Sequence, residues 1–258
     1  GGKTIRGEIR QLTSLSTLNN PPTSGAPIQL NGHGLIMFCD NMGGISMFNR
    51  SSSQISQFVA SGNCYTLVPA LDSESIIVSM QDSKIVRIDL QTQVQTILAG
   101  SSGVEGATDG FYVQSTVSNV QSIAIDPMDP FTAIFVNNFN GERSIRKLDL
   151  FHRVTTTISE LSQTISSNAP YSTTARTILP LPYDLITDAI SVAFFGTNLL
   201  IASPSHHYIL TVDLSTMRYH VKVGGNGAGD SNGFVRAVKM NQPTQMSVND
   251  LNGDIYVV

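Results

Sequence analysis

The chain has 258 residues, of which 41% are hydrophobic and only 13% are charged, and its formal net charge is −4 at pH 7. This length allows one large β domain or two small ones, and the charged share is about half of the usual ~25%. Lys and Arg are scattered along the chain, which argues against a nucleic-acid-binding stripe and against a basic membrane-surface helix. The most apolar stretch, 189–202, is interrupted by polar residues at 191 and 196–198. We therefore expect two short strands there rather than a membrane span of about 20 apolar residues.

Short apolar runs, bounded by Gly, Asn, Asp and Pro, follow one another along the chain. Such runs are typical of β-strands, and no segment keeps a helical period over about 12 residues. We expect an all-β protein whose strands fall into groups of four. The expected strands are 27–30, 34–39, 45–49 and 55–60; then 65–70, 75–80, 84–89 and 94–99; then 120–126, 132–137, 144–149 and 154–159; then 189–195, 199–203, 208–213 and 220–224.

One six-residue pattern recurs at the third strand of each group. It reads IVRIDL at 85–90, IRKLDL at 145–150 and ILTVDL at 209–214, with a weaker copy, ISMFNR, at 45–50. The anchor residues of the four copies are Asn49, Asp89, Asp149 and Asp213, and they are separated by 40, 60 and 64 residues. The first step matches a four-stranded propeller blade of about 40–45 residues, and the longer steps require insertions of roughly 20. An Asp that recurs directly after a strand indicates a repeated turn cap rather than ligands for one ion.

Two of the insertions resemble each other. The first runs from Leu98-Ala99-Gly100 through a Gly-rich stretch to Thr108-Asp109-Gly110-Phe111, and the second runs from Val223-Gly224-Gly225 to Ser231-Asn232-Gly233-Phe234. Each then leads to an expected inner strand, which ends near Asp126 or Asp250. The similar order and length indicate an internal repeat.

These residues carry a family resemblance. Residues 97–150 resemble an NHL repeat, in which a Leu-Ala-Gly turn and an Asp-Gly loop lead to an inner strand and then to an outer strand of the Ile-Arg-Lys type. The resemblance is fair over 64–100 and 189–258, poor over 1–63, and absent over 161–188. It implies a toroidal β-propeller, a fold that hosts lyases, lactonases, RNA binders and adhesive ectodomains, so it says little about activity.

The ring is expected to close through the two ends of the chain. Residues 243–258 predict only two strands of a fifth blade, which would leave an edge strand unpaired. Residues 3–15 contain strand-like runs that can complete this blade. We expect one propeller domain over 1–258 with five blades. A six-bladed ring, with a further blade in 161–188, and a fragment of a longer chain are the alternatives.

The candidate binding residues lie on one predicted face of the propeller. Loops between the second and third strands share this face with the long insertions at 100–119, 161–188 and 225–242. Polar side chains gather there, and function concentrates in such loops. The predicted ligand-binding residues are Asp40, Asn41, Asp82, Asn138, Arg143, His206, His207 and Asp230.

The sequence offers no convergent catalytic site. Of the five histidines, only His206 and His207 are expected on the loop face, and adjacent side chains usually diverge. No Gly-x-Ser-x-Gly nucleophile motif is present, and the glycines at 224–229 lack the Lys-Ser/Thr and the helix of a phosphate loop. We predict no catalytic residues, no metal and no cofactor.

Cys39 and Cys64 are the only cysteines. Two are too few for a disulfide scaffold, so two separate buried thiols are the favoured interpretation. A single Cys39–Cys64 disulfide is the alternative, because both residues are expected near a junction between blades. One N-glycosylation sequon, Asn49-Arg50-Ser51, favours secretion slightly.

The leading functional hypothesis is a non-catalytic binding module, namely the ectodomain of a cell-surface protein, located extracellularly or at the cell surface. Its expected partner is a protein or a glycan in preference to a small molecule, with no nucleic acid, and the chain is expected to be a monomer. A membrane tether outside residues 1–258 is compatible with this hypothesis. The alternatives are a metal-dependent lactonase, hydrolase or amidating-type lyase and, third, an RNA-binding NHL domain, which the acidic balance disfavours.

Overall fold

The computed structural model describes residues 28–30, 35–40, 44–59, 63–158, 188–216, 218–225, 227–232, 238–249 and 254–258. Within these ranges the chain is built almost entirely from antiparallel strands. The elements are β1 (Ile28–Leu30), β2 (Leu35–Cys39), β3 (Ile45–Asn49), β4 (Gln54–Val59), β5 (Cys64–Pro69), β6 (Ser75–Met80), β7 (Lys84–Asp89), β8 (Gln95–Gly100), β9 (Gly110–Phe111), η2 (Tyr112–Gln114), β10 (Ser122–Ile125), β11 (Thr132–Phe139), β12 (Glu142–Asp149), β13 (Val154–Thr157), β14 (Ser191–Phe195), β15 (Asn198–Ser203), β16 (Tyr208–Asp213), β17 (Arg218–Gly224), β18 (Met246–Asn249) and β19 (Asp254–Val257). None of the described helices is long and apolar enough to cross a membrane.

The strands form successive antiparallel sheets, which we call blades 1 to 5. Blade 1 is β1-β2-β3-β4, blade 2 is β5-β6-β7-β8, blade 3 is β10-β11-β12-β13 with β9 added beside β13, and blade 4 is β14-β15-β16-β17. β18 and β19 form a two-stranded blade 5. The predicted groups of four are confirmed, with strand ends that differ from the sequence-based bounds by no more than a few residues. The two short strands expected in 189–202 are β14 and β15.

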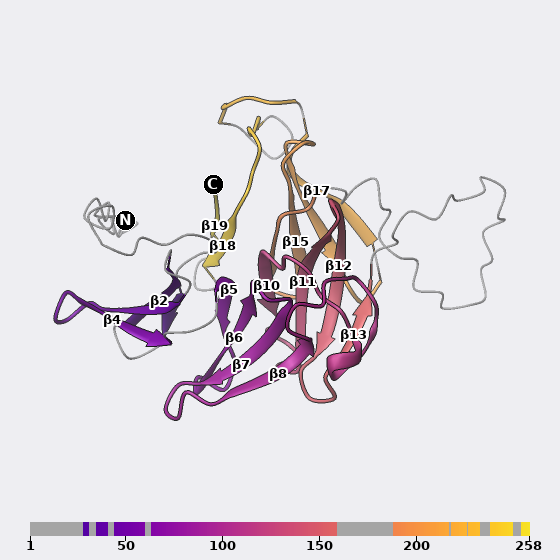
Figure 1. Ribbon diagram of the computed structural model, residues 1–258. Coiled ribbons are helices and arrows are strands. Elements are labelled where there is room, and N and C mark those ends of the chain that lie inside the picture. The colour runs from indigo at the N-terminus through magenta and orange to yellow at the C-terminus, as the bar shows by residue number, and fades with distance from the viewer. Residues whose placement is uncertain are drawn as a thin grey trace.

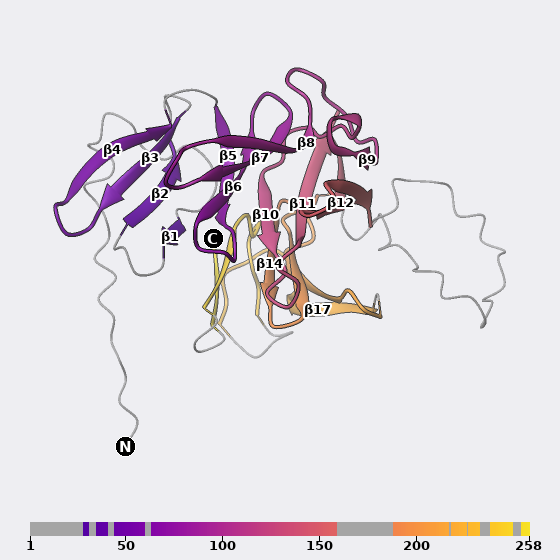
Figure 2. The ribbon, with the colours of Figure 1, turned by 90° about the horizontal axis from the view of Figure 1, so that it is seen from below.

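The blades stack face to face in chain order. One buried apolar cluster joins blades 1 and 2, and further clusters join blades 2 and 3, blades 3 and 4, and blades 4 and 5. Figures 1 and 2 show the blades following one another around an arc, from β1–β4 to β18–β19. The middle strands of blade 2 are rich in β-branched residues, and all six residues of β6 are buried. This stacking is the architecture of a β-propeller.

The four anchor residues occupy equivalent positions. Each ends the third strand of its blade, and the Oδ1 atoms of Asn49, Asp89, Asp149 and Asp213 accept hydrogen bonds from the backbone N–H groups two and three residues further on, at 2.7–3.3 Å. In blades 1, 2 and 4 the register between the third and fourth strands shifts four residues before the anchor. The predicted repeat and its turn-capping role are therefore confirmed.

Arg146 fastens the first insertion to blade 3. Its side chain is fully buried, and its guanidinium donates to the backbone oxygens of Thr116 and Thr108 at 2.6 and 2.8 Å and to Asp109 at 3.1 Å. Asp109 in turn accepts from the backbone N–H of Thr157 in β13 at 2.8 Å. The Asp-Gly loop and the Ile-Arg-Lys strand, which carried the family resemblance, are thus joined by one buried cation.

The described residues of the second insertion repeat some contacts of the first. Thr108 and Thr116 exchange hydrogen bonds across the first loop, and Ser231 and Lys239, also eight residues apart, pair across the second. In the first loop Gly106 lies against the side chain of Thr116. In the second loop Gly229 lies against the side chain of Lys239 in the same way. The predicted similarity between the insertions therefore extends to their backbone contacts.

The expectation of two free thiols is wrong. Cys39 of β2 and Cys64 of β5 form a disulfide that links blade 1 to blade 2. Both residues are 1% exposed and belong to the apolar cluster between these blades. The sequence places the cysteines near a blade junction, but the bond depends on both side chains entering the same interface, which only the packing of the two sheets determines.

The predicted closure of the ring lies outside the described residues. Residues 3–15 and most of 161–188 are not among them, so five-bladed closure stays a prediction, as does the six-bladed alternative. Among the described residues, β19 pairs only with β18.

Candidate functional site

The antiparallel sheets present two distinct ends. We call the end with the β3–β4, β7–β8, β12–β13 and β16–β17 turns the cap end, because the anchor residues cap these turns. The turns between the first and second strands of the blades lie at the same end. The opposite end, with the β2–β3, β6–β7, β11–β12 and β15–β16 turns, is the insertion end, and it carries the residues predicted to bind a ligand.

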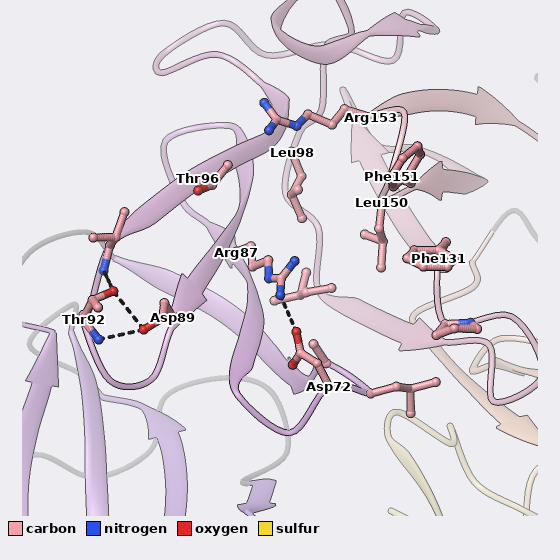
Figure 3. Close-up of a pocket in the computed structure, with 15 residues that line it drawn as sticks. Asp72, Arg87, Asp89, Thr92, Thr96, Leu98, Phe131, Leu150, Phe151 and Arg153 are labelled. Atoms are coloured by element: carbon pink, nitrogen blue, oxygen red, sulfur yellow. Dashed lines mark hydrogen bonds and ion pairs between the residues drawn. The ribbon is translucent and has the colours of Figure 1, made fainter.

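A groove of about 890 Å³ opens at the cap end between blades 2 and 3. This volume is in the range of ligand-binding clefts, about 300–1,000 Å³. We call it the blade 2–3 groove, and Figure 3 shows its two walls. It is lined by Ala70, Leu71, Asp72, Ile77, Arg87, Asp89, Thr92, Val94, Thr96 and Leu98 of blade 2 and by Pro130, Phe131, Leu150, Phe151 and Arg153 of blade 3.

The groove has an apolar floor and exposed apolar rims. Ile77 and Leu98 on the floor belong to the core between blades 2 and 3. On the rims, Phe151 is 70% exposed, Val94 60% and Phe131 55%. Large apolar side chains gathered in this way on a soluble protein are typical of an interaction surface.

Capped turns hold the two aromatic residues in place. The carboxylate of Asp129 accepts from the N–H of Phe131 at 3.1 Å, and that of Asp149 accepts from the N–H of Phe151 at 3.0 Å. The two turns are joined because the N–H of Leu150 donates to the carbonyl of Phe131 at 2.7 Å. The rings meet edge to face, with 5.8 Å between their centroids. A surface fixed in this way loses little conformational entropy on binding.

The charges in the groove leave one cation without a carboxylate partner. Arg87 is paired with Asp72 within the blade 2 wall of the groove. The carboxylate of Asp89 accepts hydrogen bonds from the backbone N–H and the hydroxyl of Thr92 in its own turn. These bonds hold the pKa of the carboxyl below its usual value. Arg153 lies over the ring of Tyr112, with 5.3 Å from its guanidinium carbon to the ring centroid. Within the described part of the chain, no carboxylate pairs with Arg153.

At the insertion end, Asp188 gathers polar side chains from blades 3 and 4. Its carboxylate accepts from the hydroxyls of Ser203 and Ser205, and its Oδ1 lies 3.3 Å from Nδ1 of His206. Arg143 of β12 donates to the Asp188 carbonyl oxygen. Burial alone would raise the pKa of Asp188, but the hydrogen bonds from Ser203 and Ser205 outweigh it, so the pKa lies below its usual value. Of the predicted site residues, Arg143 and His206 are thus brought together.

This cluster does not have the geometry of a catalytic triad. In a triad, one ring nitrogen of the histidine contacts the carboxylate and the other contacts the nucleophile. Here Nδ1 of His206 faces both Asp188, at 3.3 Å, and the hydroxyl of Ser203, at 2.7 Å. The ring stacks on Tyr208 with 5.2 Å between centroids. The cluster is arranged to connect the β15–β16 turn to blade 3 rather than to activate Ser203.

The other predicted residues do not join this cluster. Asp40 is 2% exposed and accepts from the N–H of Gly44 and the hydroxyl of Ser46. Asp82 pairs with Lys84 at 2.7 Å. His207 accepts through Nδ1 from the N–H of Gln242 at 3.2 Å. Asn138 is half-buried in β11 and Asp230 is exposed in the second insertion, while Asn41 lies outside the described residues.

Among the described residues, no group of three or more His, Cys, Asp or Glu side chains converges in the manner of a metal site. His152 lies in the β12–β13 turn and His220 on the outermost strand of blade 4, as predicted, and His33 falls outside the described ranges.

Comparison with known proteins supports the fold. No family model matches the chain, and no curated protein sequence does. A protein of unknown function from Bacteroides thetaiotaomicron has a similar solved structure, with a TM-score of 0.62 and 10% identity, over 91% of this chain and 52% of that one. The structure of a nidogen/laminin complex is also similar, with a TM-score of 0.59 and 11% identity, over 91% of this chain and 71% of that one. The chain spans about half the length of the Bacteroides protein, and at these identities the likeness shows the β-propeller fold alone.

The blade 2–3 groove was not predicted from the sequence. Its aromatic residues follow Pro130 and Leu150 in turns, where polar residues are usual. Apolar side chains at turn tips, without the alternation of a strand, were the available signal. The signal was weak because the two walls come from segments about 60 residues apart, and only the packing of the blades brings them together.

Proposed function

We propose that this protein is a non-catalytic, partner-binding β-propeller that acts at the cell surface or outside the cell. Its binding site is the blade 2–3 groove, and its ligand is an extended segment of a partner protein. The observation that carries this proposal is the gathering of Phe131, Phe151 and Val94 on rigid turns above an apolar floor. Well-packed aromatic anchors of this kind dominate the energetics of protein interfaces.

The charges of the groove specify the chemistry of the partner. Asp72 and Arg87 neutralise each other, and the carboxylate of Asp89 accepts hydrogen bonds from its own turn. Arg153 therefore supplies the positive charge that is free to pair with a ligand. A segment that places a large apolar side chain beside a carboxylate would fill the floor and pair with Arg153. Electrostatic complementarity of this kind contributes mainly to specificity and to the rate of association.

The disulfide supports an extracellular location. Disulfides persist in oxidising compartments and are rare in the cytosol, and Cys39 and Cys64 are bonded here. One of the similar solved structures is a complex of nidogen with laminin, which supports a protein as the class of ligand. We also propose that the propeller is related to NHL repeats. The similarity of the two insertions and the repeated anchor residues support this relationship.

The insertion end is a second candidate surface within the same function. The residues predicted there, Asp40, Asn41, Asp82, Asn138, Arg143, His206, His207 and Asp230, remain a proposal for ligand contacts. Exposed Ser205 and His206 at the β15–β16 turn support it. Because most of the described members are engaged in internal hydrogen bonds, the blade 2–3 groove is the stronger candidate.

A random heptapeptide library displayed on phage tests the proposal. We expect wild-type protein to enrich peptides with a large apolar residue next to Asp or Glu, and Phe151→Ala to lose their binding. Arg153→Gln should reduce the affinity for the acidic peptides and leave binding of their amide analogues unchanged. Tyr219→Ala is the matched control, because Tyr219 is an aromatic residue of blade 4 that is 42% exposed and does not line the groove.

Several outcomes would contradict the proposal. If no peptide is enriched, or if the enriched peptides bind Phe151→Ala as well as wild type, the groove is not the site. If they lose binding to Arg143→Ala instead, the insertion end is the binding surface. A small molecule that displaces no peptide but protects the groove from amide exchange would identify the ligand class as wrong.

A further inference from the structure

The β3–β4 turn differs in one respect from its counterparts in blades 2 to 4. Its anchor is an asparagine, Asn49, where the other three blades have aspartate, and it begins the chain's single Asn-x-Ser/Thr sequon. We propose that Asn49 is a site of N-linked glycosylation. This inference is independent of the proposed binding site, because it rests on a different turn in a different blade.

The geometry leaves the amide nitrogen of Asn49 available. Its Oδ1 caps the turn by accepting from the N–H groups of Ser51 and Ser52 at 2.9 and 3.3 Å. In the described structure Nδ2 has no hydrogen-bond partner. The neighbouring residues of the turn, from Arg50 to Ser53, are all exposed. An oligosaccharide on Nδ2 would therefore extend into solvent without breaking the cap.

The comparison between blades shows that the cap does not require asparagine. Asp89, Asp149 and Asp213 make the same two backbone contacts with a carboxylate oxygen. A carboxylate has no N–H group, so only blade 1 carries the acceptor nitrogen in addition to the cap. The turn is otherwise the same, because Ser53, Gln93 and Arg153 all follow their anchors by four residues and have φ of 55–58°.

The modification is a transfer of a sugar to nitrogen. Nδ2 of Asn49 attacks C1 of the first sugar of a lipid-pyrophosphate-linked oligosaccharide, and a C–N bond forms as the C1–O bond to the pyrophosphate breaks. The lipid pyrophosphate leaves with the bonding electron pair, and Nδ2 loses one proton to a base. No oxidant or reductant is needed. The hydroxyl of Ser51 completes the sequon that directs this chemistry to secreted surface loops.

The disulfide supplies the second observation. Protein disulfides form in the same oxidising, secretory compartments in which sequons are glycosylated. The bond between Cys39 and Cys64 joins blade 1, which carries the sequon, to blade 2. The disulfide is therefore an observation, separate from the sequon itself, that supports passage of blade 1 through the compartment in which sequons are glycosylated.

The test uses the native protein isolated from its own cells. It is digested with trypsin and treated with peptide-N-glycosidase in heavy-oxygen water, which converts a glycosylated Asn to an Asp that contains one heavy oxygen. We expect mass spectrometry to find this label at Asn49 and at no other asparagine. Recovery of the Asn49 peptide unmodified and in full yield without the enzyme would overturn the proposal.

Two variants separate the glycan from the fold. In a eukaryotic secretory host, Ser51→Ala and Asn49→Asp should both abolish the electrophoretic shift that the glycosidase removes. Asn49→Asp should keep the melting temperature of Ser51→Ala, which also lacks the glycan but retains Asn49, because aspartate caps the equivalent turns of blades 2 to 4. A glycosidase-sensitive shift that persists in both variants would place the glycan elsewhere and refute the assignment.

Discussion

Replacing Arg146 with methionine tests how firmly the first insertion is fastened to blade 3. Methionine keeps much of the volume of the side chain but removes every donor. The change leaves the backbone oxygens of Thr108 and Thr116 without their guanidinium partner. Arg146 itself is fully buried, and burial lowers the pKa of its guanidinium. The wild-type interaction therefore offsets a considerable desolvation cost.

The magnitude follows from these contacts. Breaking a buried ion pair costs about 3–5 kcal/mol when the remaining charge stays buried. The Asp109 side chain is 44% exposed and can be hydrated, so we expect the lower end, about 3 kcal/mol. For a chain of this size, each 1 kcal/mol lowers the melting temperature by roughly 2–4 °C, which gives a fall of about 6–12 °C.

The assay is calorimetric melting combined with amide hydrogen exchange. We expect faster exchange in residues 106–118 of Arg146→Met, because the loop loses its attachment to β12. Lys147→Met is the matched control, since Lys147 is the next residue of the same strand and is exposed, and we expect less than about 0.5 kcal/mol there. If Arg146→Met melts like this control and its loop exchanges no faster, Arg146 does not fasten the insertion.

Three further predictions concern the rest of the fold. The double substitution of Cys39 and Cys64 by serine opens a link with a sequence separation of 25, and urea unfolding should show a loss of about 3.5 kcal/mol; an unchanged midpoint would contradict this. Hydrogen bonds from Ser215 and Thr216 lower the pKa of Asp213 from 3.8 to about 2, so its contribution to stability is present above pH 3.8 and is lost as the pH falls toward 2. Asp213→Asn should therefore lose less stability than wild type in an acid titration followed by circular dichroism, and equal losses would argue against the cap. Removing residues 1–27 should speed amide exchange in β18 and β19 if residues 3–15 complete blade 5, and unchanged exchange would rule out that closure.

Short-range features of this fold could be predicted from the sequence. The bounds of β3, β6, β7 and β16 were predicted without error because glycine, asparagine and aspartate mark their turns. The role of the anchors was also predictable, since an aspartate after a strand caps backbone groups only two and three residues away. These features depend on local contacts, which a repeated pattern reveals.

Features that depend on contacts between blades could not be predicted in the same way. The Cys39–Cys64 bond requires two residues of neighbouring sheets to enter one interface. The cluster around Asp188 was missed because this residue ends a segment with no likeness to the repeat. Its partners Arg143 and His206 were both predicted to lie on the loop face, and both contact Asp188. The groove was missed because Phe131 and Phe151 become a surface only when blade 3 packs beside blade 2.

Photo-crosslinking from the two ends of the propeller tests the proposed binding site most directly. A photoreactive amino acid replaces either Val94, at the rim of the blade 2–3 groove, or Glu142, the exposed first residue of β12 at the insertion end. The probe is a labelled synthetic peptide selected from the heptapeptide library. We predict a crosslinked product from position 94 that an unlabelled copy of the peptide suppresses, and none from position 142. Crosslinking from position 142 with none from position 94 would show that the partner binds at the opposite end of the sheets.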